Sequence, residues 1–490
     1  GSLDLNRGVM LSALEVMKSD GPWVLPADVD KVNFLTQYTL DLHETQIKTA
    51  LTVYDNNWNS TDQIPQRQVL SGAMGRFGYV DPSLGGDSSR LNMVFEMSND
   101  NYSTGLYLSR YKLNLFGNFT YFQEDPLNGD AHEQVDRRWI YGGHFEFQRE
   151  LTSRINLRAG TDMRSDQIGE VSLHAVENRI RLGLVRQDSV DWLSLGVFSE
   201  LEIDISDKLR SFLGIRLDYS DYNVLANLSD NSGNGSDDIW LPSIGFAYEV
   251  GSFGELYLNW GKGFHSNDVR GATIAFDPLS NYELEPVVLF SGQDGAEVGY
   301  RVERDDDLVL SLAYFWLQSD SELIFAGDSG GTEASDGSER SGLELAVFWE
   351  LNSNWVLDLT GSIVDSKFVA VDAKSDHIPN AHGRVISMGL TRAPVLGWNW
   401  SMRVRHFGDA ALVEDDSINY PSTTIINMGL SYKTDRWTAG VDLFNLADSE
   451  HYDIAYWYSS RLLSEVSPVE DIHFHPVNPR SIRVGLEYRF

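Results

Sequence analysis

The sequence predicts an all-β fold: a transmembrane antiparallel β-barrel of about 20–22 strands, with short turns at one rim and long loops at the other. Three observations predict it. Apolar and polar residues alternate along many segments of about ten residues or more, which gives each strand one apolar and one polar face. Short turns alternate with long connections along the chain. No apolar run approaches the roughly 18 residues of a membrane-spanning helix, so only a closed barrel could cross a bilayer with its backbone paired.

Composition narrows the functions open to this chain of 490 residues. It has no cysteine, which excludes disulfides and thiolate-bound metals, and we expect no cofactor. Its 72 acidic and 38 basic residues give a net charge of −34. A nucleic-acid-binding protein needs a basic footprint instead, so no nucleic-acid partner is predicted.

The first elements are expected to be strands. Residues 8–17 are predicted as an early barrel strand. The clearest early strand is Tyr107–Tyr121, whose odd positions are mostly aromatic or apolar and whose even positions include Arg110 and Lys112. We therefore expect odd-numbered side chains such as Leu113 to face lipid, and Arg110 and Lys112 to line the lumen.

Two hairpins follow. Residues 139–148 and 155–164 alternate on either side of a turn at 151–154, and residues 193–205 and 209–219 do so around Ser206–Lys208. Further short turns are predicted at 251–254, 302–307, 351–354 and 433–436. Long connections are predicted near 56–90, 165–178, 220–238, 264–294, 318–340, 365–383, 407–422 and 446–480. Separation of short turns from long loops is typical of outer-membrane barrels.

Two sets of side chains are assigned to surfaces of the predicted barrel. A polar set of mixed charge is expected to line the lumen, and it includes Arg158, Asp162, Glu200, Glu202, Arg210, Arg216, Arg403 and Arg405. An indole prefers a membrane interface, with its apolar body in lipid and its N–H towards water. An aromatic belt beside the short turns is therefore expected from Trp192, Trp349, Trp355, Trp398 and Trp437.

The last predicted strand is Ser481–Phe490. Its apolar and aromatic residues fall at every second position, from Ile482 to the terminal Phe490. It resembles the closing strand of bacterial outer-membrane barrels, and that resemblance implies that Phe490 acts as an assembly signal.

Six stretches in order along the chain resemble TonB-dependent outer-membrane receptors: Asp20–Trp23 (DGPW), Trp58–Arg67 (WNSTDQIPQR), Gly261–Gly271 (GKGFHSNDVRG), Gly295–Gly299 (GAEVG), Asp442–Leu446 (DLFNL) and Pro479–Phe490. The resemblance spans nearly all of the chain. It implies a transporter in the outer membrane of a Gram-negative bacterium that imports a scarce nutrient such as a siderophore, haem or cobalamin. The implied partners are the energy-transducing protein TonB, the barrel-assembly machinery, and outer-membrane lipid with lipopolysaccharide.

The sequence departs from that family in one respect. Family members carry a globular plug ahead of the barrel, and no plug-like sequence precedes residues 8–17. We expect the plug domain and the first barrel strands to be absent from residues 1–490. TonB would then be reached through a plug outside this chain.

Two other functions remain open. A passive porin or structural barrel would show the same alternation of residues. An outer-membrane enzyme is suggested only by Gly327–Gly331 (GDSGG), which matches the nucleophile motif of trypsin-like proteases. No second protease motif surrounds any histidine that could serve as the base, so no enzyme activity is predicted.

Candidate binding residues fall in two predicted external loops. The loop after Gly263 supplies His265 and also Arg270, whose guanidinium can hold a carboxylate or phosphate in a fork. The loop before the last strand is richest in stacking and coordinating groups, with Tyr452, Tyr456, Trp457, His473 and His475. The two histidines share one face of an extended segment, yet no third ligand accompanies them, so no metal site is predicted. We expect the two loops together to form the ligand site.

Overall fold

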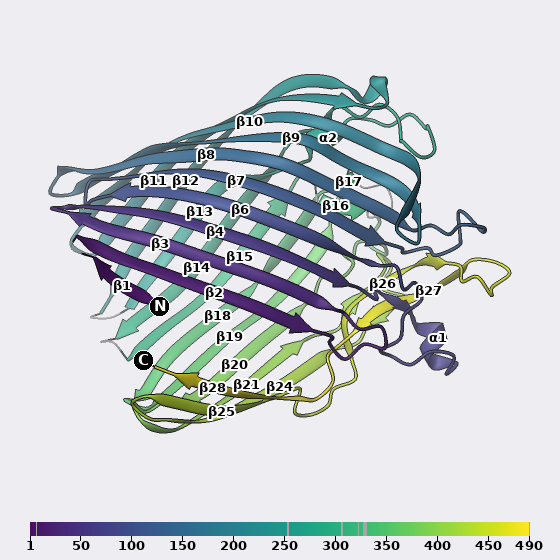
Figure 1. Ribbon diagram of the computed structural model, residues 1–490. Coiled ribbons are helices and arrows are strands. Elements are labelled where there is room, and N and C mark those ends of the chain that lie inside the picture. The colour runs from purple at the N-terminus through teal and green to yellow at the C-terminus, as the bar shows by residue number, and fades with distance from the viewer. Residues whose placement is uncertain (6, 252–253, 305–306, 322, 327–330, 490) are drawn as a thin grey trace.

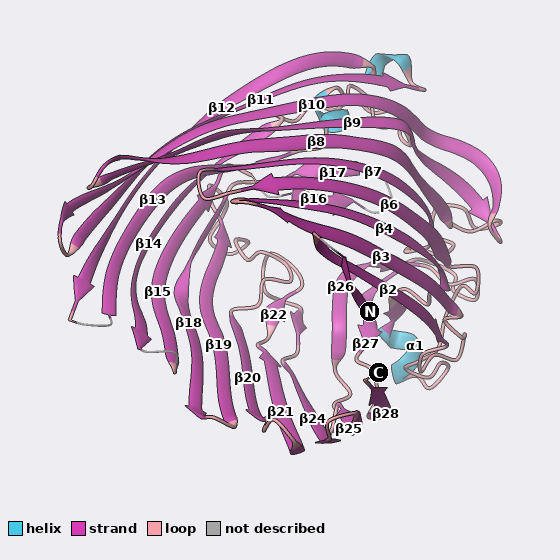
Figure 2. Ribbon diagram, turned by 60° about the vertical axis from the view of Figure 1, so that its left-hand side comes forward, coloured by secondary structure: helices cyan, strands magenta, loops and turns pink. Residues whose placement is uncertain are grey.

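One curved antiparallel sheet dominates the computed structural model, which describes residues 1–490 apart from 6, 252–253, 305–306, 322, 327–330 and 490 (Figure 1). In the described part of the chain this sheet holds 21 strands. Each strand pairs antiparallel with its neighbours along the chain, and the sheet curls on itself (Figure 2). The strands are β1 (Ser2–Leu5), β2 (Gly8–Ser19), β3 (Val29–Leu42), β4 (Thr45–Asn59), β6 (Gly85–Ser98), β7 (Tyr102–Gly117), β8 (His132–Thr152), β9 (Ile155–Glu177), β10 (Ile180–Ser206), β11 (Leu209–Ala226), β12 (Gly233–Val250), β13 (Gly254–Ser266), β14 (Phe290–Arg304), β15 (Leu308–Ser319), β18 (Ser338–Asn352), β19 (Trp355–Phe368), β20 (Arg384–Arg392), β21 (Gly397–Phe407), β24 (Thr423–Lys433), β25 (Trp437–Phe444) and β28 (Ser481–Tyr488).

Short turns and long connections lie at opposite rims, as predicted. The hairpins expected around 151–154 and 206–208 are β8–β9 and β10–β11. The same rim carries the turns at 43–44, 99–101 and 353–354. The opposite rim carries most of the long connections, which include 60–84, 267–289, 369–383 and 445–480.

Two of the predicted long connections are wrong. Residues 165–178 belong almost entirely to β9, which turns into β10 at 178–179, and most of 220–238 belongs to β11 and β12. For residues 165–178 the cause is a series of register shifts between β9 and β10 at Arg181/Gly183, Leu184/Arg186 and Asp188/Val190. A bulge inserts one residue and interrupts the alternation, so the strand continues where its period-two pattern stops.

Smaller elements lie along the long-loop rim. They are the helices α1 (Gln66–Leu70) and α2 (Val269–Ala272), the 3-10 turn η1 (Ser229–Asn231), and the short strands β5 (Ile64–Pro65), β16 (Leu323–Ala326), β17 (Gly331–Ala334), β22 (Ala410–Ala411), β23 (Asn419–Tyr420), β26 (Tyr452–Ser460) and β27 (Val469–Pro476). None of the helices among the described residues is long and apolar enough to cross a membrane.

The two faces of the sheet differ in chemistry. One carries cross-strand rows of exposed apolar residues; Leu106, Met163 and Leu195 lie in one such row and are 62%, 47% and 40% exposed. The other carries ion pairs, such as Arg158 Nε with Glu146 Oε1 at 2.7 Å. A barrel in lipid turns its apolar face outwards, so we call these the outer and inner faces. The residues predicted for the lumen share the inner face: Arg158, Asp162, Glu200, Glu202, Arg210, Arg216, Arg403 and Arg405.

The predicted facing of Tyr107–Tyr121 is wrong. The odd positions of β7 lie inside, since Ser109 Oγ donates to Asn92 Oδ1 at 2.7 Å and the Arg90 guanidinium lies 5.0 Å from the Tyr111 ring centre. Arg110 and Lys112 lie outside, in register with Trp139 and Arg137. The prediction failed because the tyrosines and leucines at the odd positions of β7 lie on the inner face. The even positions are apolar at Leu106 and Leu108 and become charged only further along the strand.

Three of the tryptophans predicted for an aromatic belt lie beside short turns and are exposed, as that prediction requires. Trp349, Trp398 and Trp437 are 39%, 57% and 47% exposed, and Trp437 lies 4.3 Å from Tyr488, measured between ring centres. Trp355 instead packs against Trp400 at 5.9 Å. Trp192 was wrongly assigned, because it lies in the middle of β10 and its Nε1 donates to Ser220 Oγ at 2.5 Å on the inner face.

The predicted first and last strands are present. Residues 8–17 lie in β2, and the final strand is β28, which pairs with β25. Ile482, Val484 and Leu486 of β28 are 68%, 77% and 70% exposed. Phe490 lies outside the described residues, so its assembly role stays a prediction.

Candidate functional site

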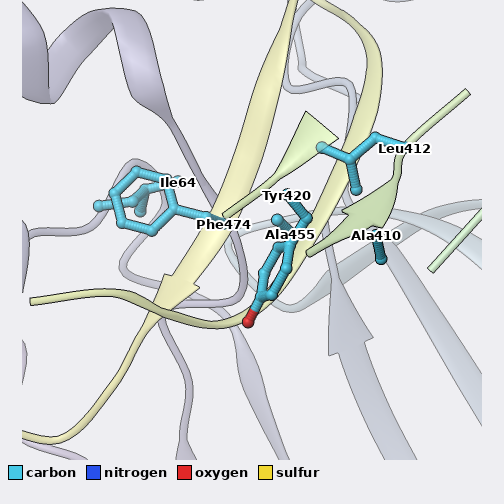
Figure 3. Packing of buried hydrophobic residues seen from close by; sticks show 6 residues of the cluster. All are labelled: Ile64, Ala410, Leu412, Tyr420, Ala455 and Phe474. Atoms are coloured by element: carbon cyan, nitrogen blue, oxygen red, sulfur yellow. The ribbon is translucent and has the colours of Figure 1, made fainter. Parts of the chain in front are cut away.

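Three connections at the long-loop rim pack together into what we call the rim cluster. Its buried members are Ile64, Ala410, Leu412, Tyr420, Ala455 and Phe474 (Figure 3). They come from segments 60–84, 408–422 and 445–480, which are far apart in the sequence. β27 pairs with both β26 and β5, so backbone hydrogen bonds as well as apolar packing hold the last loop against the 60–84 loop.

Two of the predicted aromatic residues of the last loop, Tyr452 and Trp457, pack against this cluster. The Tyr452 ring lies 4.2 Å from that of Phe474, and its hydroxyl accepts a hydrogen bond from Gln66 Nε2 at 2.5 Å. Trp457 packs against the cluster. Tyr456 is 39% exposed, so part of its ring remains open to solvent.

The two predicted histidines differ in environment although they share one face of β27. His473 is fully buried, with Nε2 2.7 Å from Ser460 Oγ and its ring stacked on Tyr458 at 3.7 Å. Burial, reinforced by the nearby Arg67 charge, lowers the pKa of His473 to about 3. His475 is partly exposed; its Nδ1 lies 3.6 Å from Asp453 Oδ2 and its ring 4.6 Å from that of Trp23.

Arg67 joins the 60–84 loop to the last loop of the rim cluster through ion pairs and a hydrogen bond. Its Nε lies 2.8 Å from Glu465 Oε1 and its Nη1 3.2 Å from Asp471 Oδ2, and a further hydrogen bond joins Nη2 to Ser460 Oγ at 3.0 Å. All three partners belong to the last loop. The side chains of both ion pairs are less than one-fifth exposed, so these contacts are well shielded from solvent.

A second packed region lies on the inner face of β9–β11. The 267–289 loop folds against this wall through Val269 and Leu289, which contact Ile168, Val190 and Val224. Beside it lies a cavity of about 460 Å³, which we call the inner-wall cavity. Its walls carry three arginines, Arg138, Arg164 and Arg270. They also carry aromatic side chains, which include Trp192, Phe264 and Phe290.

The arginines of the inner-wall cavity are held by carboxylates that lie deeper in the wall. Arg164 Nε lies 2.5 Å from Asp166 Oδ2; the arginine side chain is 52% exposed and the aspartate 3%. Arg138 is paired with Asp136 in the same way, with 24% and 17% exposed. The carboxylates fix the guanidinium planes and leave part of each facing the lumen. Such a surface suits carboxylate or phenolate oxygens of a ligand.

The predicted Arg270 is part of this cavity but is already paired. Its Nη2 lies 2.6 Å from Asp268 Oδ2, and its Nη1 lies 3.9 Å from Asp188 Oδ2. Burial alone would lower the pKa of Arg270, and the paired Asp268 carboxylate outweighs it and raises that pKa. Arg270 therefore fastens the 267–289 loop to the wall and lines the cavity with the rest of its side chain.

Among the described residues, the candidate residues of the two predicted loops lie in different packed regions. Arg270 pairs with Asp268 and Asp188, and His265 lies near the end of β13 with Nδ1 3.4 Å from Gln293 Nε2. Tyr452, Trp457 and His473 instead belong to the rim cluster. Whether any of these residues binds a ligand stays a prediction.

Sequence reasoning missed Arg138, Arg164 and their aspartates as site residues. A signal was present: Arg and Asp recur two positions apart, on one face of a strand or turn, at 136/138, 164/166, 186/188, 216/218 and 268/270. In the structure all five are ion pairs. The protease-like motif 327–331 lies almost wholly outside the described residues.

Comparison with known proteins decides the family. The family model described as TonB dependent receptor-like, beta-barrel matches residues 24–446, which is most of the chain. The chain belongs to the TonB-dependent receptor family. Barrels of this family lie in the Gram-negative outer membrane and serve nutrient uptake with TonB, and the family is one of receptors and transporters, not of enzymes. The predicted family and its antiparallel barrel fold are confirmed.

Solved structures share the fold at low sequence identity. The ferric yersiniabactin uptake receptor of Yersinia pestis has a TM-score of 0.76 at 12% identity, covering 100% of this chain and 77% of that one. The unliganded ferric citrate transporter FecA has a TM-score of 0.78 at 11% identity, with 99% and 74% covered. The copper transporter OprC has 0.73 at 12% identity, with 100% and 77% covered.

Proposed function

We propose that this TonB-dependent receptor imports a small anionic metal complex and binds it at the inner-wall cavity. The observation that carries the proposal is the set of guanidiniums on that wall, held in place by buried carboxylates between aromatic side chains. A cavity of about 460 Å³ lies within the range of small-molecule sites, roughly 300–1,000 Å³. The names of similar structures agree, since they include receptors for ferric citrate, ferric yersiniabactin and ferric catecholates.

The charge arrangement favours an anion over a cation. The carboxylates of the wall are already engaged by arginine and lie deeper, whereas Arg164 keeps about half of its side chain exposed. A ligand that meets this wall first encounters guanidinium N–H groups. A carboxylate can accept two of them at once, which makes the contact geometrically specific.

The rim cluster would then act at the entrance. Tyr456 and His475 are the predicted residues there with partly exposed rings, so we propose them as contacts for an incoming ligand. Tyr452, Trp457 and His473 support those contacts from within the cluster. We propose a separate supporting role for His265 at the end of β13, next to Phe264 and Ser266 of the inner-wall cavity.

A plug for this lumen would come from polypeptide other than residues 1–490. The described residues form the sheet, its turns and the rim connections, and their helices are short. We propose that TonB is contacted through such a plug. Binding to TonB by the barrel chain alone would contradict this.

The test uses Arg164→Gln in cells that rely on this receptor, with uptake measured from ferric citrate, a ferric catecholate, haem and cobalamin. Loss of a charge-assisted hydrogen bond is expected to raise the half-saturation concentration by about 10- to 100-fold for the transported anionic complex. Arg301→Gln is the matched control, because it removes an arginine paired with Glu255 near the opposite rim. Equal uptake by parent and Arg164→Gln cells for every compound would overturn the site.

Inactivation of TonB separates active uptake from passive diffusion. Uptake that depends on this barrel should stop in cells without TonB. Uptake that continues unchanged would favour the passive porin instead, whatever the effect of Arg164→Gln.

A further inference from the structure

One row of side chains on the inner face of β4–β8 alternates between tyrosine and arginine. Tyr54 of β4 is in register with Arg90 of β6, and Arg90 with Tyr111 of β7. Tyr111 is in turn in register with Arg138 of β8. These strands lie side by side (Figure 1), and since neighbouring strands are about 4.8 Å apart, the four residues extend roughly 14 Å across the wall. We call them the Tyr–Arg row; Arg138 at its end also lines the inner-wall cavity.

Arg90 is the cation of this row without a carboxylate partner. Among the described residues its side chain forms neither an ion pair nor a hydrogen bond, and it is exposed on the inner face. Its guanidinium lies 5.0 Å from the Tyr111 ring centre, a cation–π contact that leaves its N–H groups free to donate. Arg138, by contrast, is paired with Asp136. The row therefore offers one complete guanidinium fork to the lumen.

The neighbouring inner rows do not neutralise Arg90. In the row towards the short-turn rim, Asn92 Nδ2 donates to Thr52 Oγ1 at 2.9 Å, and Asn92 Oδ1 accepts from Ser109 Oγ at 2.7 Å. The row on the other side is uncharged on the same three strands and consists of Asn56, Ser88 and Leu113. An anion that approaches Arg90 therefore meets no carboxylate in either neighbouring row of β4, β6 and β7.

Two tyrosines beside a free guanidinium favour an aromatic anion. The Arg90 fork can take a carboxylate or phenolate oxygen from any organic anion. A ring gains in addition from offset or edge contacts with Tyr54 and Tyr111, whereas an aliphatic chain has no such contact to make.

We propose that the Tyr–Arg row binds an aryl ring that carries an acidic oxygen and belongs to the imported metal complex. This rests on the proposed function and narrows its anionic complex to one whose organic ligand is aromatic. The ring lies against Tyr54 and Tyr111, and its acidic oxygen accepts hydrogen bonds from Arg90. Because Arg138 belongs to the row and to the inner-wall cavity, one ligand spans both.

The experiment measures binding of two ferric probes to the whole receptor purified in detergent. One is a tris-catecholate complex, which has aryl rings, and the other is ferric citrate, which has none. With Arg90→Gln, the affinity for the catecholate complex should fall about 10-fold, through loss of a charge-assisted hydrogen bond. With Tyr111→Leu it should fall about threefold to 10-fold, through loss of ring contacts. Ferric citrate affinity should change less than about threefold in both variants, because this complex has no ring to place on the row.

Arg405→Gln is the matched control. Arg405 is likewise exposed on the inner face without an ion pair among the described residues, but it lies on β21, in register with Ser387 and Ile425 instead of tyrosines. This variant should bind both probes as the parent does. Heat-modifiability on gels confirms that each variant is folded.

Arg164→Gln separates failure of the Tyr–Arg row from failure of the inner-wall cavity. Weaker binding in Arg164→Gln, with Arg90→Gln equal to the parent, would overturn the row and keep the cavity. Weaker catecholate binding in Arg90→Gln, with Arg164→Gln equal to the parent, would keep the row and overturn the cavity. An equal loss of both probes in Arg90→Gln, or a parent receptor that binds ferric citrate and not the catecholate complex, would overturn the aromatic ligand. A parent that binds neither probe would overturn both proposals.

Discussion

At the scale of single residues, burial of His473 couples the rim cluster to pH. Its pKa in the folded loop is about 3, and an unfolded histidine titrates near 6.5. Between these values the undocked loop binds the proton and the docked loop does not. The docking free energy is therefore fully present above pH 6.5 and falls by about 1.4 kcal/mol for each pH unit below it.

Hydrogen exchange of the amides in β27, corrected for intrinsic rates, should show this loss between pH 7 and pH 5. His473→Gln removes the titrating ring and should make protection independent of pH in that window. The carboxylate of Glu465, whose pKa is lowered mainly by its hydrogen bond with Arg67, adds a further loss only as pH falls below about 4.5. Protection that falls equally in parent and variant would contradict the role of His473.

Arg67 and Arg76 provide a contrast in ion pairing at the same rim. Arg67→Ala leaves Glu465 and Asp471 without their partner in a shielded place, which typically costs about 3–5 kcal/mol. Arg76→Ala removes a 3.7 Å pair with Glu450, whose side chain is 81% exposed, and a 3.1 Å hydrogen bond to the His451 carbonyl, and should cost about 1–2 kcal/mol. Limited proteolysis of segment 445–480 on intact cells measures both. Equal cleavage of the two variants would show that the Arg67 pairs do not hold the loop.

At the scale of strands, alternation predicted which segments cross the membrane but not always which way they face. In β9 and β11 the charged positions were assigned correctly, because Arg158, Asp162 and Arg216 alternate with aliphatic residues. In β7 the inner face carries Tyr107 and Tyr111, so the apolar or aromatic character of a residue does not identify the outer face of this strand. The contacts that settle the direction, such as that of Ser109 with Asn92, join neighbouring strands and depend on register.

The cavity was harder to predict than the fold for a related reason. Its arginines come from β8, β9 and the 267–289 loop, which only the completed sheet brings together. The predicted Arg270 was found because its motif resembles the family. The bulges in β9 and β10 interrupt the alternation of apolar and polar residues, so the full length of these strands could not be predicted.

The corrected facing of β7 makes a testable prediction. Leu106→Arg places a charge on the outer face of a residue that is 62% exposed, and such a charge near the middle of the bilayer costs about 2–4 kcal/mol. Ser109→Arg places the same side chain on the inner face and should be tolerated. Heat-modifiability on gels should show impaired assembly for Leu106→Arg only. The opposite ranking would restore the facing expected from sequence.

Glycines on the inner face make room for tyrosines of the neighbouring strand. A Cβ at Gly142 would lie 2.2 Å from Cζ of Tyr107, so Gly142→Ala must displace that ring. Overpacking of this kind typically costs about 1–3 kcal/mol. Gly183→Ala, also in a strand, meets no atom within 4 Å and should be nearly neutral. Thermal unfolding in detergent, followed by gel shift, compares the two variants.

At the scale of the whole molecule, a barrel made from a sheet this wide has a lumen that its own side chains cannot fill. A barrel of about 20 strands leaves an open lumen unless something occupies it. Residues 1–490 reconstituted alone in a planar bilayer should therefore conduct ions. A folded preparation that stays silent would show that the rim connections close the mouth without a plug.

The contacts of Arg67 also order events in time. Every pairing in the main sheet joins strands that follow one another in sequence, so each hairpin can form as soon as both of its strands exist. Arg67 and Asp471 are 404 residues apart, and the entropy of closing so long a loop delays their meeting. We therefore expect β5 to join β27 late in folding, and the time at which segment 445–480 becomes protected from protease checks this order.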